Sequence, residues 1–152
     1  AEAKMFLFWA ARAQHVRDFI LPALRQGTLV LCDSFSDATY AYQGFGRGLD
    51  QKFIGAVNDY SAMQLKPDMT LLFDLPVETG LERATARNNR LADPAATDRF
   101  ERETLDFHRR IREGYLTILN NEPERFRLID ATRKIPVIQE EVRRHISSFI
   151  KV

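Results

Sequence analysis

Residues 29–49, LVLCDSFSDATYAYQGFGRGL, gather side chains that are well suited to holding a small molecule. Asp33 follows an apolar run, and open α/β sheets bind their ligands at the carboxyl ends of such strands. Tyr42 and Gln43 add a flat aromatic ring and an amide that can both donate and accept hydrogen bonds. Arg47 then lies in a glycine-rich loop, where the backbone can approach a ligand closely. The stretch predicts one wall of a small-molecule site.

Phe8 and Arg12 are four residues apart, so they share one face of any helix that forms there. An aromatic ring beside a guanidinium group suits a nucleobase, which can stack on the ring while its edge accepts hydrogen bonds. The alternative is a core phenylalanine beside a surface arginine. On these two residues alone, that alternative is the favoured one.

The basic residues are unevenly distributed. Arginine outnumbers lysine 17 to 5, and residues 83–112 contain eight arginines and no lysine. Arginine binds phosphate through paired N–H donors, so a polyphosphate ligand is a fair inference from this run. For any single arginine, a solvated helix face paired with nearby Glu and Asp is at least as good an interpretation. The net charge of +1 argues against nucleic-acid binding through a broad basic surface.

The chain of 152 residues, 45% of them hydrophobic, is predicted to form a single domain over residues 1–152. Cys32 is the only cysteine, so neither a disulfide nor a zinc site can be built from cysteine pairs. No signal peptide or membrane-spanning run is visible. The sequence therefore predicts a cytoplasmic, soluble protein.

The apolar patterns alternate between helices and strands. Unalternated apolar runs predict buried parallel strands, whereas spacings of three and four predict helices. The predicted strands cover residues 29–32, 69–75 and 127–129. The predicted helices cover 2–25, 50 to about 62, 76 to about 87, about 98–121 and 136–150, and 88–96 is predicted to be a loop. This order indicates an α/β fold with a doubly wound parallel sheet flanked by helices.

Three blocks carry a resemblance to a known family: FWAARAQH, AYQGFGRGLD and DRFERETLDFHRRIREGYL. In this order they resemble the bacterial thymidylate kinases, over about Glu2 to Ile150. The resemblance implies a P-loop kinase fold and transfer of the γ-phosphoryl of ATP to dTMP, which yields dTDP and ADP for dTTP synthesis. It also implies ATP and Mg²⁺ as cofactors and a homodimer in the cytoplasm.

The resemblance assigns the acceptor nucleotide to residues of the first two blocks and the segment between them. Phe8 would stack on thymine, with Arg12 and Gln43 bonding its edge and Thr39 nearby. Tyr42 would line the deoxyribose and disfavour a 2′-hydroxyl. These roles follow from the family and are expectations for this chain.

The resemblance also assigns the metal and the donor nucleotide. Asp33 would hold Mg²⁺ directly or through water, which suits a hard oxygen ligand. A lid over residues 87–99 would close on ATP and neutralise charge in the transition state, as arginine fingers do. Arg90 and Arg99 are the expected catalytic arginines and Arg87 the third of the lid, while Glu101 and Tyr115 would orient it.

Two departures from the family stand out. The residue after the strand-end aspartate, an arginine that grips the dTMP phosphate in the family, is Ser34 here. Arg47 is the expected replacement for that clamp.

The second departure is the absence of a G-x-x-x-x-G-K-[ST] phosphate loop from this sequence, which resembles the C-terminal two-thirds of the enzyme. We expect a preceding segment of about sixty residues, because the strands predicted here would otherwise leave backbone groups unpaired in a buried sheet.

Alternative functions remain open on the sequence. One is a catalytically inactive nucleotide-binding or dimerisation module, which Ser34 and the missing phosphate loop would support. Another is a kinase for a different deoxynucleotide, against which Phe8, Arg12 and Gln43 argue because together they suit thymine.

Overall fold

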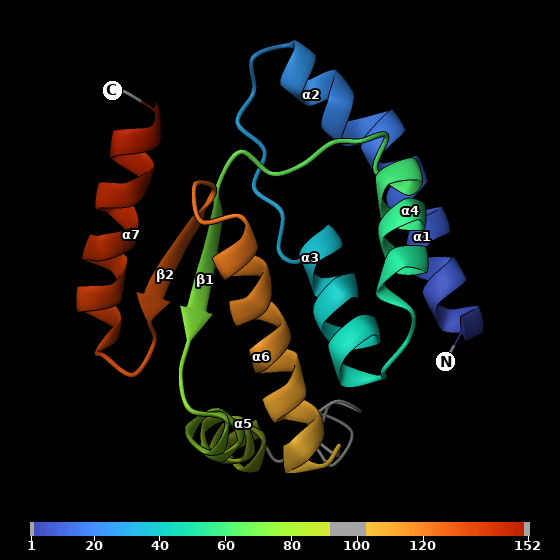
Figure 1. Ribbon diagram of the computed structural model, residues 1–152. Helices are drawn as coiled ribbons and strands as arrows, with labels where there is room; N and C mark the ends of the chain where they lie inside the picture. The colour runs from blue at the N-terminus through green and yellow to red at the C-terminus, as the bar shows by residue number, and fades with distance from the viewer. Residues whose placement is uncertain (1, 92–102, 151–152) are drawn as a thin grey trace.

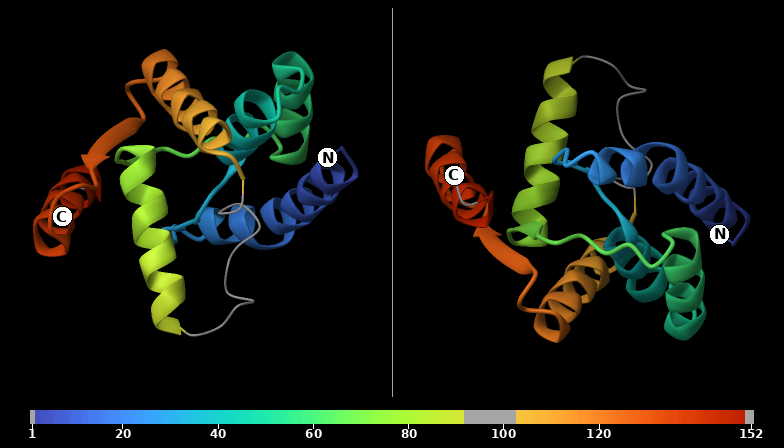
Figure 2. Two further views of the ribbon diagram at one scale, coloured as in Figure 1. Left: turned by 90° about the horizontal axis from the view of Figure 1, so that it is seen from below. Right: turned by 90° about the horizontal axis from the view of Figure 1, so that it is seen from above.

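The structure, a computed structural model, describes residues 2–91 and 103–150 (Figure 1). Its elements in chain order are α1 (Glu2–His15), η1 (Val16–Ile20), α2 (Leu21–Arg25), α3 (Ser36–Thr39), η2 (Tyr40–Gly46), α4 (Gln51–Ser61), β1 (Thr70–Asp74), α5 (Val77–Leu91), α6 (Leu105–Asn121), β2 (Phe126–Asp130) and α7 (Ile135–Ile150). The first and last helices lie at opposite ends of the molecule (Figure 2).

Residues 2–25 form one helical run, as predicted, in which the π-helical turn η1 joins α1 to α2. Gly27 ends the run with a φ of 73°, and its N–H bonds to the carbonyl of Leu24. The buried residues are Met5, Trp9, Val16 and Ile20. Phe6 and Phe19 are exposed although they belong to the same apolar spacing, because apolar residues occur on several faces of this run and spacing alone does not choose among them.

The strand predicted for residues 29–32 is wrong. Within the described residues this segment has no strand partner, and its side chains are open to solvent: Leu29 is 55% and Leu31 82% exposed. Cys32, expected to be buried, is also exposed. An apolar run becomes a strand only where neighbouring backbone pairs with it, and a cavity separates this segment from β1.

The other two predicted strands are confirmed as β1 and β2. They pair in parallel, with Leu72 opposite Leu128 and with Asp74 opposite Asp130 at their carboxyl ends. Helix α7 packs along β2. The described residues thus contain a small parallel sheet with helices around it, which is an α/β arrangement; the doubly wound sheet was the finer expectation.

The remaining helices form close to where the sequence predicts them, with identifiable caps. Helix α5 continues to Leu91, so the loop predicted for residues 88–96 is wrong over 88–91, and the rest of that loop lies outside the described residues. Asp50 caps α4 by accepting hydrogen bonds from the backbone N–H of Lys52 at 2.8 Å and of Phe53 at 3.5 Å. Thr104 caps α6 in the same way, through the N–H of Phe107. That helix was expected to begin near residue 98 but begins at Leu105, and residues 103 and 104 before it are not helical. On α4, Tyr60 faces solvent and is 88% exposed.

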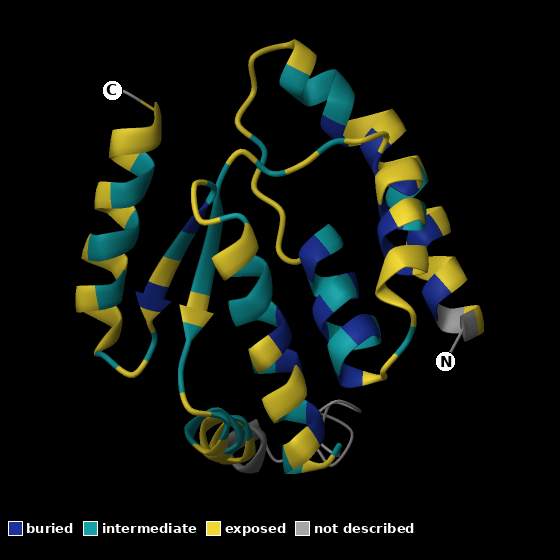
Figure 3. Ribbon diagram, in the orientation of Figure 1, coloured by how far each residue is buried: buried dark blue, intermediate teal, exposed yellow. Residues whose placement is uncertain are grey.

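Helices α3 and η2 run without a break over residues 36–46, which we call the central segment (Figure 1). One core cluster, of Met5, Trp9 and Ile54, packs against Tyr40 of this segment. A second cluster joins Ala41 of the segment to Phe107 and Ile111 of α6. The central segment is therefore packed on both sides, and the buried positions of Figure 3 concentrate around it.

Two glycines allow the central segment and α6 to pack closely, because each glycine leaves room for side chains of the other element. A Cβ added at Gly46 would lie 2.8 Å from the ring of Phe107 and 3.0 Å from the side chain of Ile111. A Cβ at Gly114 of α6 would lie 2.8 Å from the ring of Phe45. Any side chain at these positions would force the two elements apart.

We expect Gly46→Ala to lower the free energy of unfolding by about 1–3 kcal/mol, because overpacking a filled core displaces its neighbours. Gly80→Ala in α5 is the matched control, since its nearest neighbour is Leu75 at 4.0 Å and alanine should stabilise that helix by about 0.5–1 kcal/mol. Urea denaturation of both variants measures the effect. Equal stability of Gly46→Ala and the parent chain would contradict the packing described here.

Candidate functional site

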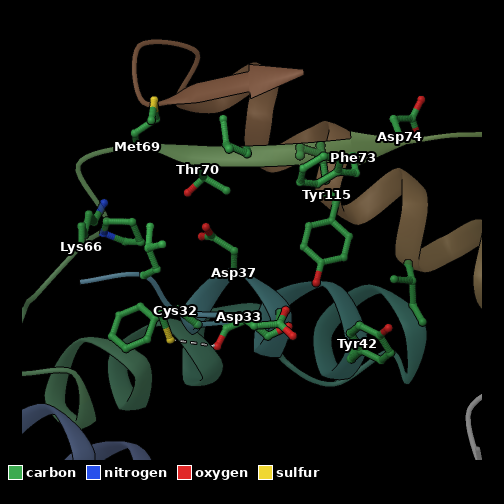
Figure 4. A pocket seen from close by; sticks show the side chains of 18 of the residues that line it. Cys32, Asp33, Asp37, Tyr42, Lys66, Met69, Thr70, Phe73, Asp74 and Tyr115 are labelled. Carbon is green, nitrogen blue, oxygen red and sulfur yellow. Dashed lines mark hydrogen bonds between the residues drawn. The ribbon is translucent and has the colours of Figure 1, made fainter. Parts of the chain in front are cut away.

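A cavity of about 1060 Å³ runs along β1, between that strand and the coil that precedes α3 (Figure 4). Four of the residues singled out in the sequence line it, namely Asp33, Ser34, Tyr42 and Tyr115. Helix α6 supplies a further wall with His108, Arg112 and Tyr115. The cavity therefore combines an apolar strand with carboxylate, hydroxyl and guanidinium groups.

Asp33 lies in coil rather than at the end of a strand, and it is exposed to the cavity. Ser34 beside it has a φ of 68°, in the left-handed region that few residues other than glycine adopt. Strained backbone of this kind is often found at functional sites. The Sγ of Cys32 donates to the carbonyl of Ser34 at 3.5 Å, and partial desolvation of this otherwise exposed thiol raises its pKa.

Tyr115 faces this coil from the opposite wall. Figure 4 shows its ring directed from α6 toward the elements that carry Asp33, Asp37 and Tyr42. Burial raises the pKa of its hydroxyl, and Tyr42 and the two carboxylates raise it further. The hydroxyl therefore stays protonated at neutral pH and can donate a hydrogen bond to an anionic ligand.

Arg12 is fixed at the junction of α1, α4 and the central segment. Its Nη2 donates to the Thr39 hydroxyl at 2.8 Å and to the Phe35 carbonyl at 3.2 Å, and its Nη1 donates to Asn58 at 2.8 Å. Burial lowers the pKa of the guanidinium, with smaller opposing effects from Cys32 and Asp37. The predicted neighbours Arg12 and Thr39 are thus in direct contact. Phe8, one turn before Arg12, is 44% exposed.

An ion pair that the sequence did not predict anchors the other side of the central segment. Arg125 grips Asp37 with two hydrogen bonds of 2.7 and 2.8 Å, and it also bonds to Thr70 at 2.9 Å. Both charged side chains are nearly buried, with 13% and 12% of their surface exposed. The two residues are 88 positions apart, so no local pattern could have paired them.

A second unpredicted pair closes one end of the cavity. Arg112 of α6 binds Asp74 at the end of β1 through its Nε at 2.6 Å and its Nη2 at 2.8 Å. This fork-to-carboxylate contact ties α6 to the carboxyl end of the sheet. The strand-end position of Asp74 and the arginine-rich helix were visible in the sequence, but their pairing was not.

Gln43 and Arg47 lie outside the cavity lining, as do Phe8, Arg12 and Thr39. Gln43 is partly buried on η2. Arg47 forms an ion pair with Glu103 and lies 4.6 Å from the ring centre of Phe107, so it is already engaged. The role of Arg47 as a substitute phosphate clamp stays a prediction.

The predicted lid is only partly described. Arg87 is exposed on α5, and Arg90 lies in the last turns of the same helix. Residues 92–102, with Arg99 and Glu101, lie outside the described residues. Arg83, one turn before Arg87, donates to the carbonyl oxygens of Ala131 and Thr132 after β2.

The described residues contain no group of three or more His, Cys, Asp or Glu side chains that could hold a metal ion by themselves. Mg²⁺ commonly takes only one or two carboxylates and completes its shell with water and phosphate oxygens. Asp33, exposed to the cavity, fits this mode of binding. Among the described helices, none is both long and apolar enough to cross a membrane.

The cavity lies beside a parallel sheet in a protein of the α/β class, and it is lined by an apolar strand, by carboxylates and by arginine and tyrosine side chains. Sequence comparison resolves this class further. The sequence model described as thymidylate kinase matches residues 1–142. The chain belongs to the thymidylate kinase family.

Individual relatives agree with this family. The thymidylate kinase of Syntrophus aciditrophicus is 53% identical over 146 residues, which cover 96% of this chain and 67% of the relative. The thymidylate kinase of Desulfovibrio desulfuricans is 47% identical, with 99% and 70% covered. That of Nitratidesulfovibrio vulgaris is 49% identical, with 98% and 69% covered.

Proposed function

We propose that the chain is a dTMP kinase, an enzyme that transfers the γ-phosphoryl of ATP to dTMP. Membership of the thymidylate kinase family over almost the whole chain supports this reaction. The structural observation that carries it is the fixed guanidinium of Arg12 beside Thr39, at the positions where the family reads its nucleobase. The reaction needs positioning and charge stabilisation more than covalent chemistry from the protein.

In this proposal the thymine ring stacks on the exposed face of Phe8, and its edge accepts hydrogen bonds from Arg12. Thr39 already accepts a bond from Arg12, so its own proton remains available for the base. Gln43 completes the edge from η2, and Tyr42 lines the deoxyribose. The phosphate then extends toward the cavity that holds Asp33.

The cavity would hold the reacting phosphates. When bound, Mg²⁺ would neutralise their charge, and Asp33 is the carboxylate placed to hold it or its water shell. Tyr115 donates its hydroxyl proton to the same region. Arg87, Arg90 and Arg99 close over ATP from the lid.

The reaction is tested by measuring ADP formation that depends on dTMP, with ATP and Mg²⁺ present. We expect turnover, and we expect Arg12→Ala to weaken dTMP binding about 10- to 100-fold, since a hydrogen bond from a charged group contributes about 1.5–3 kcal/mol. Arg17→Ala is the control, because Arg17 lies on the same helical run and pairs only with its neighbour Asp18 among the described residues.

Binding of dTMP without turnover would favour the alternative, an inactive nucleotide-binding module, which Ser34 supports. No binding of dTMP would contradict the proposed site. The cytoplasmic location stays a prediction.

Ser34→Arg should raise the affinity for dTMP by about tenfold or more, because it restores a charged partner for the phosphate. Ser34 already has a Cβ in the left-handed region, so the change adds little backbone strain. Calorimetric titration with dTMP and with thymidine measures the effect, which should be confined to dTMP. Ser34→Ala is the control, and an equal gain for thymidine would contradict the assignment.

We also propose that the chain forms a homodimer through the face of α1 and α4. Phe6, Trp9 and Phe53 pack edge to face there, and the rings of Phe6 and Phe53 remain 52% and 45% exposed. Exposed apolar clusters of this kind commonly mark protein interfaces.

Phe53→Glu should therefore convert a dimer into a monomer, because a desolvated carboxylate cannot pair with its symmetry mate. Analytical ultracentrifugation measures the mass. Phe149→Glu on α7, a phenylalanine of similar exposure far from α1, is the control and should leave the dimer intact. A monomeric parent chain would contradict the proposal.

A further inference from the structure

Asn58 of α4 holds a buried hydrogen-bonding centre that the sequence did not predict. Its side chain is 1% exposed, and its Oδ1 accepts from the indole Nε1 of Trp9 at 2.7 Å and from Nη1 of Arg12 at 2.8 Å. Its Nδ2 donates to the carbonyl of Ser36 at 3.2 Å. One amide thus connects α1, α4 and the start of the central segment.

The orientation of this amide follows from its partners. Indole and guanidinium nitrogens can only donate, so the oxygen of Asn58 must face Trp9 and Arg12, and its nitrogen must face the carbonyl of Ser36. Both lone pairs of the oxygen are in use. A buried amide that lost one of these contacts would leave a polar group without a partner in an apolar cluster.

Asn58 also fixes what Arg12 can offer a ligand. The bonds to Asn58, Thr39 and Phe35 use three of the five N–H donors of the guanidinium. The Nε–H and one Nη1–H lie outside these three bonds. Thr39 and Phe35 accept from Nη2, whereas Asn58 accepts from Nη1. Without the Asn58 side chain, Nη2 would stay bound and the rest of the guanidinium could rotate.

We propose that Asn58 is a positioning residue for base recognition, which sets the rotation of the Arg12 guanidinium so that its remaining donors face the base. This inference rests on the proposed dTMP site. Fixed donors favour a base that presents a carbonyl over one that presents an amino group, so Asn58 would contribute to discrimination between thymine and cytosine. It would do so without touching the nucleotide.

Trp9 provides a direct signal of this arrangement. It is the only tryptophan of the chain and shares the Asn58 oxygen with Arg12. Its indole N–H gives a single resonance in a ¹H–¹⁵N spectrum, which should shift when Arg12 engages a ligand. The Nη resonances of Arg12, assigned with Arg12→Lys, measure the rotation of the guanidinium without any nucleotide.

The test compares the parent chain with Asn58→Ala in titrations with dTMP and dCMP. We expect Asn58→Ala to weaken dTMP binding by about tenfold and to bring the dTMP/dCMP preference close to one, because the lost hydrogen bond frees Arg12. The Arg12 Nη resonances, separate in the parent, should average in the variant. An unchanged preference in folded Asn58→Ala would overturn the inference.

Two further variants separate positioning from simple loss of stability. Asn58→Asp keeps an acceptor oxygen for Arg12, so its Arg12 Nη resonances should stay separate and it should keep the preference for dTMP over dCMP. Ser61→Ala removes another buried polar group of α4 that bonds only to the backbone, and it should lower stability without changing the preference. If Asn58→Ala does not fold, Asn58→Leu is used in its place, because leucine has the same branched shape as asparagine and offers no acceptor to Arg12.

The two proposals fail in different ways. If the parent chain binds no dTMP, the proposed function is wrong, and the Arg12 resonances alone decide the inference. Averaged Nη resonances in the parent chain would then show that Asn58 does not fix the guanidinium. If the parent chain binds dTMP and Asn58→Ala keeps the parent's preference for dTMP over dCMP, only the inference is wrong.

Discussion

The position of the central segment depends on one desolvated ion pair, between Arg125 and Asp37. Breaking a pair of this kind typically costs about 3–5 kcal/mol, because the remaining charge stays buried without a partner. Burial opposes the charge of Arg125, but its hydrogen bonds to Asp37 and Glu122 outweigh that effect and raise its pKa. Through Thr70 the same guanidinium reaches β1, so helix and sheet share one anchor.

The opposite side of the central segment is held by Asn58, whose oxygen accepts hydrogen bonds from the neutral indole of Trp9 and the cationic guanidinium of Arg12. The two contacts differ in kind. The Arg125–Asp37 ion pair fixes the position of the central segment, whereas the Asn58 amide fixes the orientation of Arg12 relative to that segment. Arg12 and Thr39 thus lie between these two polar contacts, and the cavity lies beyond the Asp37 side of the segment.

Local chemistry was enough to predict most of the fold. The helix cap at Asp50, the strands at 70–74 and 126–130 and the long first helix all follow from short-range patterns, and the structure confirms them. Residues 29–32 failed because a strand requires a partner that no local pattern supplies. The apolar run was real, but the structure leaves Leu31 in solvent.

The candidate site was predictable only where chemistry and spacing coincide. Phe8 and Arg12 stand out because an aromatic and a cation share a helix face. Asn58 left a weaker signal, a polar residue between Ile54 and Ser61 on the buried side of α4. Its partners lie 46 and 49 positions away, so its role depends on tertiary contacts.

The surroundings of the glycines also limit which substitutions the sequence can accept. At Gly46 and Gly114 an added Cβ would lie 2.8 Å from a neighbouring aromatic ring, so any other residue there requires that ring to shift. Gly27 and Gly48 have positive φ and open surroundings, so asparagine is an acceptable replacement there. Two kinds of glycine in one chain therefore place different limits on its evolution.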